Sequence, residues 1–402
     1  MSNDWRRREF LKLAIAATAG MPFCTPAPPL RTRPFVRSED LFVAGMNGVR
    51  EYRIPALATT AKGTLLALCD ARVEEPGDAP NNIDLVLKRS EDQGETWSRM
   101  AVVADFPGSR AACDPCMLVD GRTGRVWVIY DHVWPDLESL ERANQVLPQG
   151  VKPDGTGRII TLHAIVSEDD GKTWSPPVDI TRQLTQEGWV AVMAAPGRGI
   201  RTASGRLVVP CYSRRVDGSG RQGDYSSVAY SDDRGQSWTL GSAAGPATNE
   251  CQVVELANGD LMLNMRSYHG RGCRAVATSG DGGESWSELR HDTELIEPRC
   301  QASLIGYGAG ADSGGQNRLL FSNPAHRKER VNMTVRLSSD SGATWPVSRV
   351  IHPGPSAYSC LTVLEDGKVG LLYENGSESP YERISFARFN LEWLTGGNVQ
   401  PA

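Results

Sequence analysis

The sequence has little that would suit it to bind nucleic acid or to cross a membrane. Its 402 residues carry 43 lysines and arginines against 48 aspartates and glutamates, and no basic block lies outside the N-terminus. Nucleic-acid surfaces are typically basic with interleaved aromatic side chains, so no nucleic acid is expected as a partner. No apolar run approaches the length that spans a bilayer, so no transmembrane segment is predicted.

Metal-ligand patterns are also missing. The six histidines show no HExxH or similar spacing. Cys113-x-x-Cys116 lacks a second pair, and we interpret it as a buried thiol or a local turn. We therefore predict no metal and no cofactor. Nine cysteines, one of them in the N-terminal leader, leave eight that permit disulfides, whose pairing the sequence does not define.

The N-terminus has the features of an export signal. The stretch Arg7–Lys12, RREFLK, fits the twin-arginine pattern and precedes a weakly apolar run, although Arg6 stands where Ser or Thr is usual. We predict that residues 1–30 are a signal peptide and Pro-rich linker and that residues 31–402 form a single domain. The protein is then expected to be exported, either periplasmic or secreted.

One octapeptide recurs five times, always as S-x-D-x-G-x-[ST]-W. The aspartate accepts nearby backbone N–H bonds and the glycine tolerates positive φ, so each copy is a turn. A short β-rich run precedes nearly every copy, which predicts a hairpin connection whose tryptophan folds back onto the sheet. The copies are SEDQGETW from Ser90, SEDDGKTW from Ser167, SDDRGQSW from Ser231, SGDGGESW from Ser279 and SSDSGATW from Ser338.

The repeat spacing predicts an all-β fold. Successive serines lie 77, 64, 48 and 59 residues apart, the length of one small unit with variable loops. Strand-rich units of this length are typical of four-stranded propeller blades. Five turns leave one blade, which the N-terminal and C-terminal strands could complete, so we predict a six-bladed β-propeller. A short helix is expected only at Asp136–Gln145.

Three arginines stand out among the charged residues. Arg53, Arg266 and Arg330 lie at the ends of strand-like runs in different repeats. They would converge near the propeller axis if their strands are the inner ones. Convergent guanidinium groups are suited to bidentate carboxylate binding, whereas any one of them alone is more simply a surface residue.

At this point the chain resembles the bacterial-type sialidases, which are exo-α-neuraminidases. The octapeptide resembles the Asp-box of that family, and Tyr52–Pro55, YRIP, resembles its Arg-Ile-Pro signature. The resemblance extends from about Phe42 to Phe389. It implies a six-bladed propeller that releases terminal α-linked sialic acid from glycoproteins, glycolipids or oligosaccharides.

The resemblance also implies three catalytic residues. Tyr358 matches the nucleophile, Glu250 the glutamate that activates it, and Asp78 the general acid/base. A neutral hydroxyl avoids repulsion from the sugar's carboxylate, and a phenol with a pKa near ~10 needs an adjacent base. Double displacement would retain the anomeric configuration. We expect the arginine cluster to lower the pKa of Tyr358.

Five further residues take binding or supporting roles by the same resemblance. Arg53, Arg266 and Arg330 match the triad that grips the C1 carboxylate of sialic acid. Arg72 resembles an additional arginine of the substrate pocket, and Glu374 matches a glutamate that braces Arg53.

Other functions remain open at the level of sequence. The same site could hydrolyse another 2-keto sugar acid such as Kdn or Kdo, or transfer sialic acid to a sugar acceptor. A propeller that binds sialic acid without turnover would be expected to have lost one of the catalytic residues. Because Cys251 adjoins Glu250 and Cys360 follows Tyr358 closely, we also predicted that thiol modification reduces activity.

Overall fold

The computed structural model describes residues 33–402 except 150, 188, 217–218, 309–317 and 397–402. The predicted signal peptide and linker, residues 1–30, lie outside the described residues. The described residues from Arg33 onward belong to one compact unit. In the part of the chain that the structure describes, no helix is long and apolar enough to cross a membrane.

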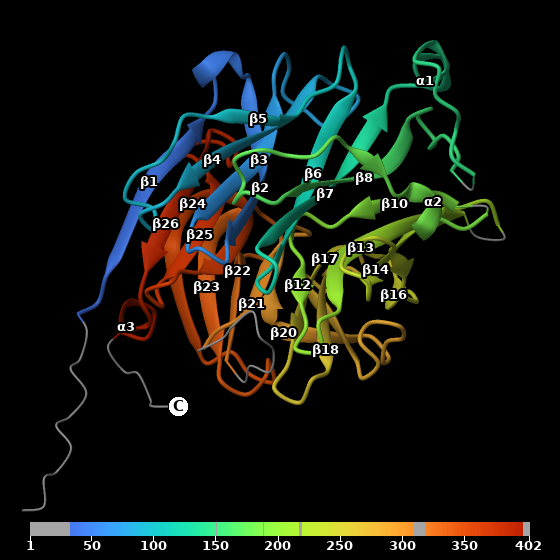
Figure 1. The fold of residues 1–402 in the computed structure, drawn as a ribbon. Coiled ribbons are helices and arrows are strands. Elements are labelled where there is room, and N and C mark those ends of the chain that lie inside the picture. Colours follow the sequence, from blue (N-terminus) through green and yellow to red (C-terminus); the bar gives the residue numbers. More distant parts are fainter. Residues whose placement is uncertain (1–32, 150, 188, 217–218, 309–317, 397–402) are drawn as a thin grey trace, which may run out of the picture. The chain divides into compact units, whose positions relative to one another are not determined.

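Four hydrogen-bonded sheets make up the described chain (Figure 1), and the largest has nine strands. It contains two antiparallel sets of four strands, joined where Ile83 pairs in parallel with Ala111. The first set is β2 (Glu51–Thr59), β3 (Leu65–Arg72), β4 (Ile83–Ser90) and β5 (Ala101–Ala104). The second is β6 (Ala111–Asp120), β7 (Arg125–Trp134), β8 (Ile159–Ser167) and β9 (Val178–Asp179), with β11 (Gly197–Arg198) added beside β6.

The next two sheets each contain one antiparallel set of four. The third set is β10 (Trp189–Ala194), β13 (Leu207–Val216), β14 (Gln222–Ser231) and β15 (Thr239–Leu240), with the short β12 (Ile200–Arg201) and β16 (Gly245–Pro246) at its margins. The fourth set is β17 (Thr248–Glu255), β18 (Leu261–Ser267), β19 (Cys273–Ser279) and β20 (Arg290–Ile296).

The seven-stranded sheet holds the last two sets and ties the two described ends of the chain together. Its order is β1 (Val36–Val43), β26 (Arg383–Phe389), β25 (Val369–Asn375), β24 (Val347–Val363), β23 (Val331–Ser338), β22 (Leu319–Pro324) and β21 (Ser303–Gly306). The long β24 pairs with β23 through its first part and with β25 through its second. Because β1 pairs with β26, the N-terminal and C-terminal strands do complete one set, as predicted.

The pairing therefore divides into six sets of four strands, the arrangement that six blades require, although the strands belong to four sheets and the blade count stays a prediction. Helices are few, as the sequence predicts. Helix α1 (Leu137–Arg142) lies inside the expected segment, and Asp136 caps it by accepting a hydrogen bond from Ser139 N at 2.7 Å. Among the described residues, the others are a 3-10 turn (Met46–Gly48), α2 (Thr181–Leu184) and α3 (Leu391–Leu394).

Each of the five repeats has the same pattern of hydrogen bonds. In each, one aspartate oxygen accepts from the serine hydroxyl two residues earlier, at 2.7 to 2.9 Å. The other oxygen accepts from the Ser or Thr hydroxyl four residues later, at 2.5 to 2.7 Å. The turn is thus closed within itself, which confirms its prediction from sequence. The aspartates are Asp92, Asp169, Asp233, Asp281 and Asp340.

Each repeat turn also packs against the neighbouring set of strands. Gly235, with φ of 81°, lies so close to Trp127 of β7 that an added Cβ would come within 2.5 Å of the ring. Gly94 lies in the same way against Phe386 of β26, which Trp97 of the same repeat meets edge-on at 5.1 Å. The tryptophan folds back onto the core as predicted, and the turns fasten one set to the next.

Candidate active site

One cavity, of about 330 Å³, gathers the residues that the sequence singled out. Seven of the eight predicted site residues line it, and the eighth, Glu374, lies fully buried against two of them. The lining residues among them are Arg53, Arg72, Asp78, Glu250, Arg266, Arg330 and Tyr358.

Several of these residues lie where the pairing between two strands is interrupted. Pairing shifts register within β2, β6, β17 and β24, where the two paired strands differ in residue count and the bulged strand bends. Ile54, a β-branched residue, has a φ of 59°, a conformation that the surrounding structure must hold in place. The predicted site residues at these shifts are Arg53, Glu250 and Tyr358, and Asp114, which also lines the cavity, lies at the shift in β6.

Tyr358, Glu250 and Arg266 form one hydrogen-bonded group. The Tyr358 hydroxyl donates a short hydrogen bond to Glu250 Oε1. Arg266 Nη1 donates to Glu250 Oε2 at 2.7 Å and to the Tyr358 oxygen at 3.0 Å. Tyr358 and Glu250 are both almost entirely buried. The carboxylate is therefore placed to take the phenol proton, and the arginine is placed to stabilise the oxygen left behind.

The expected lowering of the Tyr358 pKa is wrong in its net direction. Burial raises the pKa of the phenol well above its usual value, and the adjacent Glu250 carboxylate raises it further. Arg266 and Arg330 act in the opposite sense but do not outweigh these effects. The phenol is thus neutral at rest, so its use as a nucleophile requires proton transfer to Glu250 during the reaction.

Glu374 supports more of the site than the predicted brace of Arg53. Its side chain is fully buried on β25, and Oε1 accepts from Arg53 Nε at 2.7 Å and from Ile54 N at 2.8 Å. Oε2 accepts from Tyr358 N at 2.9 Å. One carboxylate therefore fixes the strained bulge of β2 and the bulge of β24 together.

The three predicted arginines do converge, around Tyr358. The Cζ atoms of Arg53 and Arg330 each lie 5.5 Å from the centre of its ring, while Arg266 bonds its hydroxyl. The condition that all three lie on inner strands is wrong. Arg53 is on β2, the first strand of its set, but Arg266 lies next to the end of the second strand β18, and Arg330 precedes the third strand β23.

Arg72 and Asp78 form an ion pair at the edge of the cavity. Arg72 Nη2 donates to Asp78 Oδ1 at 2.6 Å, and Nη1 donates to Glu51 at 3.2 Å. The Arg72 side chain is almost buried, whereas 84% of the Asp78 side chain is exposed, on the loop between β3 and β4. Asp78 can thus meet both a substrate in the cavity and solvent water.

Known proteins are similar in sequence to this chain over most of its length. A family model described as a BNR repeat-like domain matches residues 63–371. An exo-alpha-sialidase of Aspergillus fumigatus is 31% identical, over 87% of this chain and 86% of that protein. The chain belongs to the sialidase family. Its fold is accordingly the β-propeller of that family.

Two other sialidases are more similar in sequence. A sialidase of Bacteroides fragilis is 36% identical over 83% of this chain, which spans only 61% of that relative's length. The solved structure of the Hadza microbial sialidase Hz136 is 35% identical with a TM-score of 0.77, covering 89% of this chain and 69% of its own.

This sialidase-family cavity contains a tyrosine that the sequence analysis missed. The Tyr381 ring lies 3.8 Å from Arg53 Cζ, and its hydroxyl accepts from Arg330 Nη1 at 2.8 Å. Tyr381 therefore contacts two arginines of the triad. It lies between β25 and β26 with no repeat or motif around it, so the sequence carried no signal for this contact.

Three acidic side chains in the cavity were also missed. Burial, with Glu250 and Asp78 nearby, raises the pKa of Asp114 to about 7, and burial raises the pKa of Asp70 and of Asp131 well above the usual range. Asp70 accepts from Asp114 N at 3.2 Å, and Asp131 from Ala194 N at 2.8 Å. Such carboxyl groups suit the hydroxyl and amide groups of a sugar. Asp114 falls inside the Cys113-x-x-Cys116 stretch that we interpreted as a thiol or turn.

Among the described cysteines, Cys113 lines the cavity, whereas Cys251 and Cys360 do not. All eight described cysteines are buried and free. Cys251 is 1% exposed and Cys360 is fully buried, so neither thiol lies at the surface. The prediction that thiol modification reduces activity is not supported by this burial. Within the residues that the structure describes, no group of three or more His, Cys, Asp or Glu side chains is placed to hold a metal ion.

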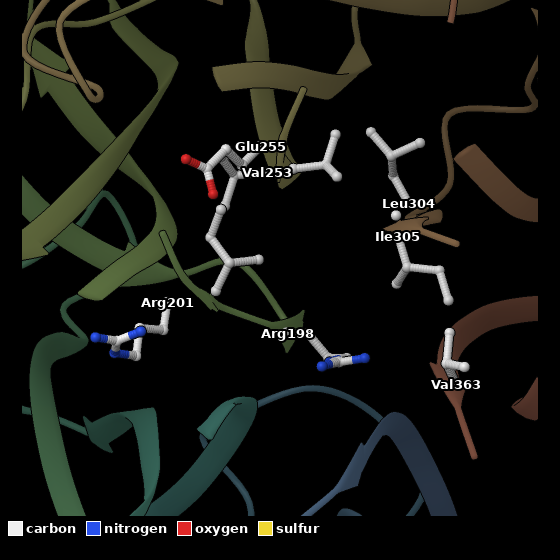
Figure 2. A pocket seen from close by; sticks show the side chains of 10 residues that line it. Arg198, Arg201, Val253, Glu255, Leu304, Ile305 and Val363 are labelled. Atoms are coloured by element: carbon white, nitrogen blue, oxygen red, sulfur yellow. The ribbon is translucent and has the colours of Figure 1, made fainter. Parts of the chain in front are cut away.

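A second cavity, drawn in Figure 2, shares no residue with the first. Its volume is about 40 Å³, which admits a few water molecules but no sugar. Figure 2 shows Arg201 and Glu255 on one side of this cavity, Leu304, Ile305 and Val363 on the other, and Arg198 between them. It is not the candidate active site.

Proposed function

We propose that this protein is an exo-α-sialidase, which hydrolyses terminal α-linked sialic acid from glycoconjugates with retention through a covalent Tyr358 intermediate. The observation that carries the proposal is the buried Tyr358–Glu250–Arg266 group among three arginines in one cavity. A tyrosine, an acceptor for its proton and a site for an anion are parts that this reaction requires, and Asp78 in the same cavity adds the acid/base.

Arg53, Arg266 and Arg330 bind the carboxylate of the sugar. Guanidinium groups bind carboxylates through paired hydrogen bonds, and partial burial strengthens these contacts. The shared carboxylate of Glu374 and the ring of Tyr381 hold Arg53 in place. The anomeric carbon, which carries the sugar carboxylate, is thereby brought to the Tyr358 oxygen.

In the first step the Tyr358 oxygen attacks the anomeric carbon while its proton passes to Glu250. The bond to the leaving oxygen breaks, and that oxygen takes a proton from the protonated form of Asp78. In the second step Asp78 accepts a proton from water, which attacks the same carbon. The tyrosine oxygen leaves and recovers its proton from Glu250. Two displacements give net retention.

The test is release of a fluorescent umbelliferyl group from α-linked N-acetylneuraminic acid by the wild type and by Tyr358→Phe. We expect activity in the wild type and a large loss in the folded variant. Proton NMR of the fresh product should show the α anomer first, because retention precedes mutarotation. Immediate appearance of the β anomer would contradict the covalent intermediate.

The alternatives are separated by substrate. A wild type that is inactive on the sialoside but cleaves Kdn or Kdo glycosides is a hydrolase of another 2-keto sugar acid. Formation of a new sialoside when lactose is added would reveal transfer. Binding of free sialic acid with no turnover of any glycoside would leave a binding propeller.

We also propose that the protein is exported through the twin-arginine route and acts in the periplasm or as a secreted enzyme. The support is the stretch Arg7–Lys12. Replacing both Arg7 and Arg8 with lysine should leave the protein in the cytoplasm, as measured by cell fractionation. Normal export of that variant would contradict the proposal.

A further inference from the structure

Arg158 lies beside the candidate active site but has no role in the mechanism so far. It precedes β8 in the second set of strands, and it lines the same cavity as Tyr358. Its Nη1 donates to the backbone carbonyl of Ala79 at 2.6 Å. Ala79 directly follows Asp78, so this bond joins the loop that carries the acid/base to the neighbouring set.

A buried aspartate holds Arg158 in place. Asp154 is 7% exposed, and its Oδ2 accepts from Arg158 Nε at 2.8 Å and lies 2.7 Å from Nη2. Its Oδ1 accepts from Thr156 N, the Thr156 hydroxyl and Arg158 N, at 2.6 to 3.1 Å. The segment from Asp154 to Arg158 is therefore a closed turn that orients the guanidinium before substrate arrives.

The loop around Asp78 needs such support. The Asp78 side chain is 84% exposed, and the ion pair with Arg72 holds it from one side. Ala79 packs in the hydrophobic core with Ile83 and Ile160, and both of these line the cavity with it. The contact from Arg158 fixes the backbone between this packed residue and the exposed carboxyl, which sets where the carboxyl can reach.

We propose that Arg158, anchored by Asp154, is a positioning residue that holds Asp78 at the leaving oxygen. The inference rests on the proposed function, in which Asp78 is the general acid. Loss of this positioning should reduce activity on some substrates more than on others, depending on the leaving group. Departure of a sugar alkoxide needs a proton from the acid, whereas a nitrophenolate leaves readily without one. Misplacing Asp78 should therefore harm the first reaction more than the second.

The experiment compares kcat/KM for sialyllactose and for nitrophenyl α-sialoside. In Arg158→Gln we expect the value for sialyllactose to fall about tenfold more than that for the nitrophenyl substrate, a part of the usual contribution of general acid catalysis. Arg158→Lys should show a smaller selective loss, because one ammonium group cannot hold both the Ala79 carbonyl and Asp154 Oδ2 through separate nitrogens as the guanidinium does. If the glutamine variant does not fold, the lysine variant decides.

Two further variants make the result decisive. Asp78→Ala should show the full selective loss, and adding Arg158→Gln to it should cause no further selective loss, because the arginine acts through Asp78. The control Arg125→Gln removes an exposed partner of Glu168 in the same set of strands and should leave the ratio unchanged.

The outcomes separate the two proposals. Equal losses on both substrates in Arg158→Gln, or a selective loss that persists without Asp78, would overturn the positioning role. A wild type that cleaves neither substrate would instead overturn the sialidase function, on which the inference rests.

Discussion

The repeat turns and the active-site cavity differ in how far their contacts reach along the chain. In every repeat, the aspartate bonds residues two and four positions away, and the same distances recur five times. In the cavity, Tyr358 bonds Glu250 across 108 residues, and Arg53 bonds Glu374 across 321. The turns are local structures, whereas the site exists only when the sets of strands are assembled.

The turns and the site also differ in what they cost the folded protein. An exposed turn that satisfies its own hydrogen bonds places little demand on the rest of the fold. The site buries the charges of Glu250, Arg53 and Glu374, and it holds Ile54 at a φ of 59°. Such groups cost free energy unless each is paired, so their pairing must come from the assembled propeller. The turns help to supply that assembly by packing one set against the next.

The comparison predicts that the largest effects on activity come from the long-range contacts. Glu250→Gln removes the acceptor for the phenol proton, and we expect kcat to fall by about 10²–10⁴-fold. Because the two residues act as a unit, Glu250→Gln combined with Tyr358→Phe should be scarcely worse than either alone. The measurement is kcat with the umbelliferyl sialoside.

The control for this variant is Glu255→Gln, on the same strand β17. Its carboxylate accepts from Ala203 N and takes no part in the cavity of the proposed site. We expect unchanged kcat. Multiplicative losses in the double variant would contradict the idea that Tyr358 and Glu250 form one catalytic unit.

The second prediction compares a buried ion pair with an exposed one. Glu374→Ala leaves the nearly buried Arg53 without its carboxylate, and breaking a buried pair costs about 3–5 kcal/mol of unfolding free energy. Glu168→Ala breaks the exposed pair with Arg125 and should cost at most about 1 kcal/mol. Urea unfolding gives both values, and similar costs would remove the distinction between site and surface.

How much could be predicted follows the same division. The turn chemistry of Asp92 and its four counterparts was readable because each partner lies within four residues. Their places at strand ends drew attention to Arg53, Arg266 and Arg330, but the roles of all eight site residues came from family resemblance, since no local pattern joins them. Tyr381, Asp70 and Asp131 escaped, because their positions depend on how separate sets meet. The pKa of Tyr358 was mispredicted because burial, which sequence does not reveal, outweighs the arginines.

The third prediction tests whether the turns fasten neighbouring sets. Gly235→Ala would place a Cβ within 2.5 Å of Trp127 as well as straining a φ of 81°. Gly259 has a similar φ of 87° but nothing within 4 Å of its Cβ position, so it isolates the backbone strain. We expect Gly235→Ala to lower the unfolding free energy by about 1–3 kcal/mol more than Gly259→Ala. Equal costs would mean that the turn does not press on its neighbour.

The smallest effect should come from one repeat aspartate. Hydrogen bonds from the Ser237 hydroxyl and backbone N–H, with Ser231, lower the pKa of Asp233 to about 2. Since the unfolded carboxyl titrates near ~4, its contribution is present above that pH and is lost as pH falls through about 2. Asp233→Asn should therefore cost about 1 kcal/mol near neutral pH, less below pH ~3, as measured by urea unfolding. A cost that stays constant on acidification would show that the charge of Asp233 is not what these hydrogen bonds stabilise.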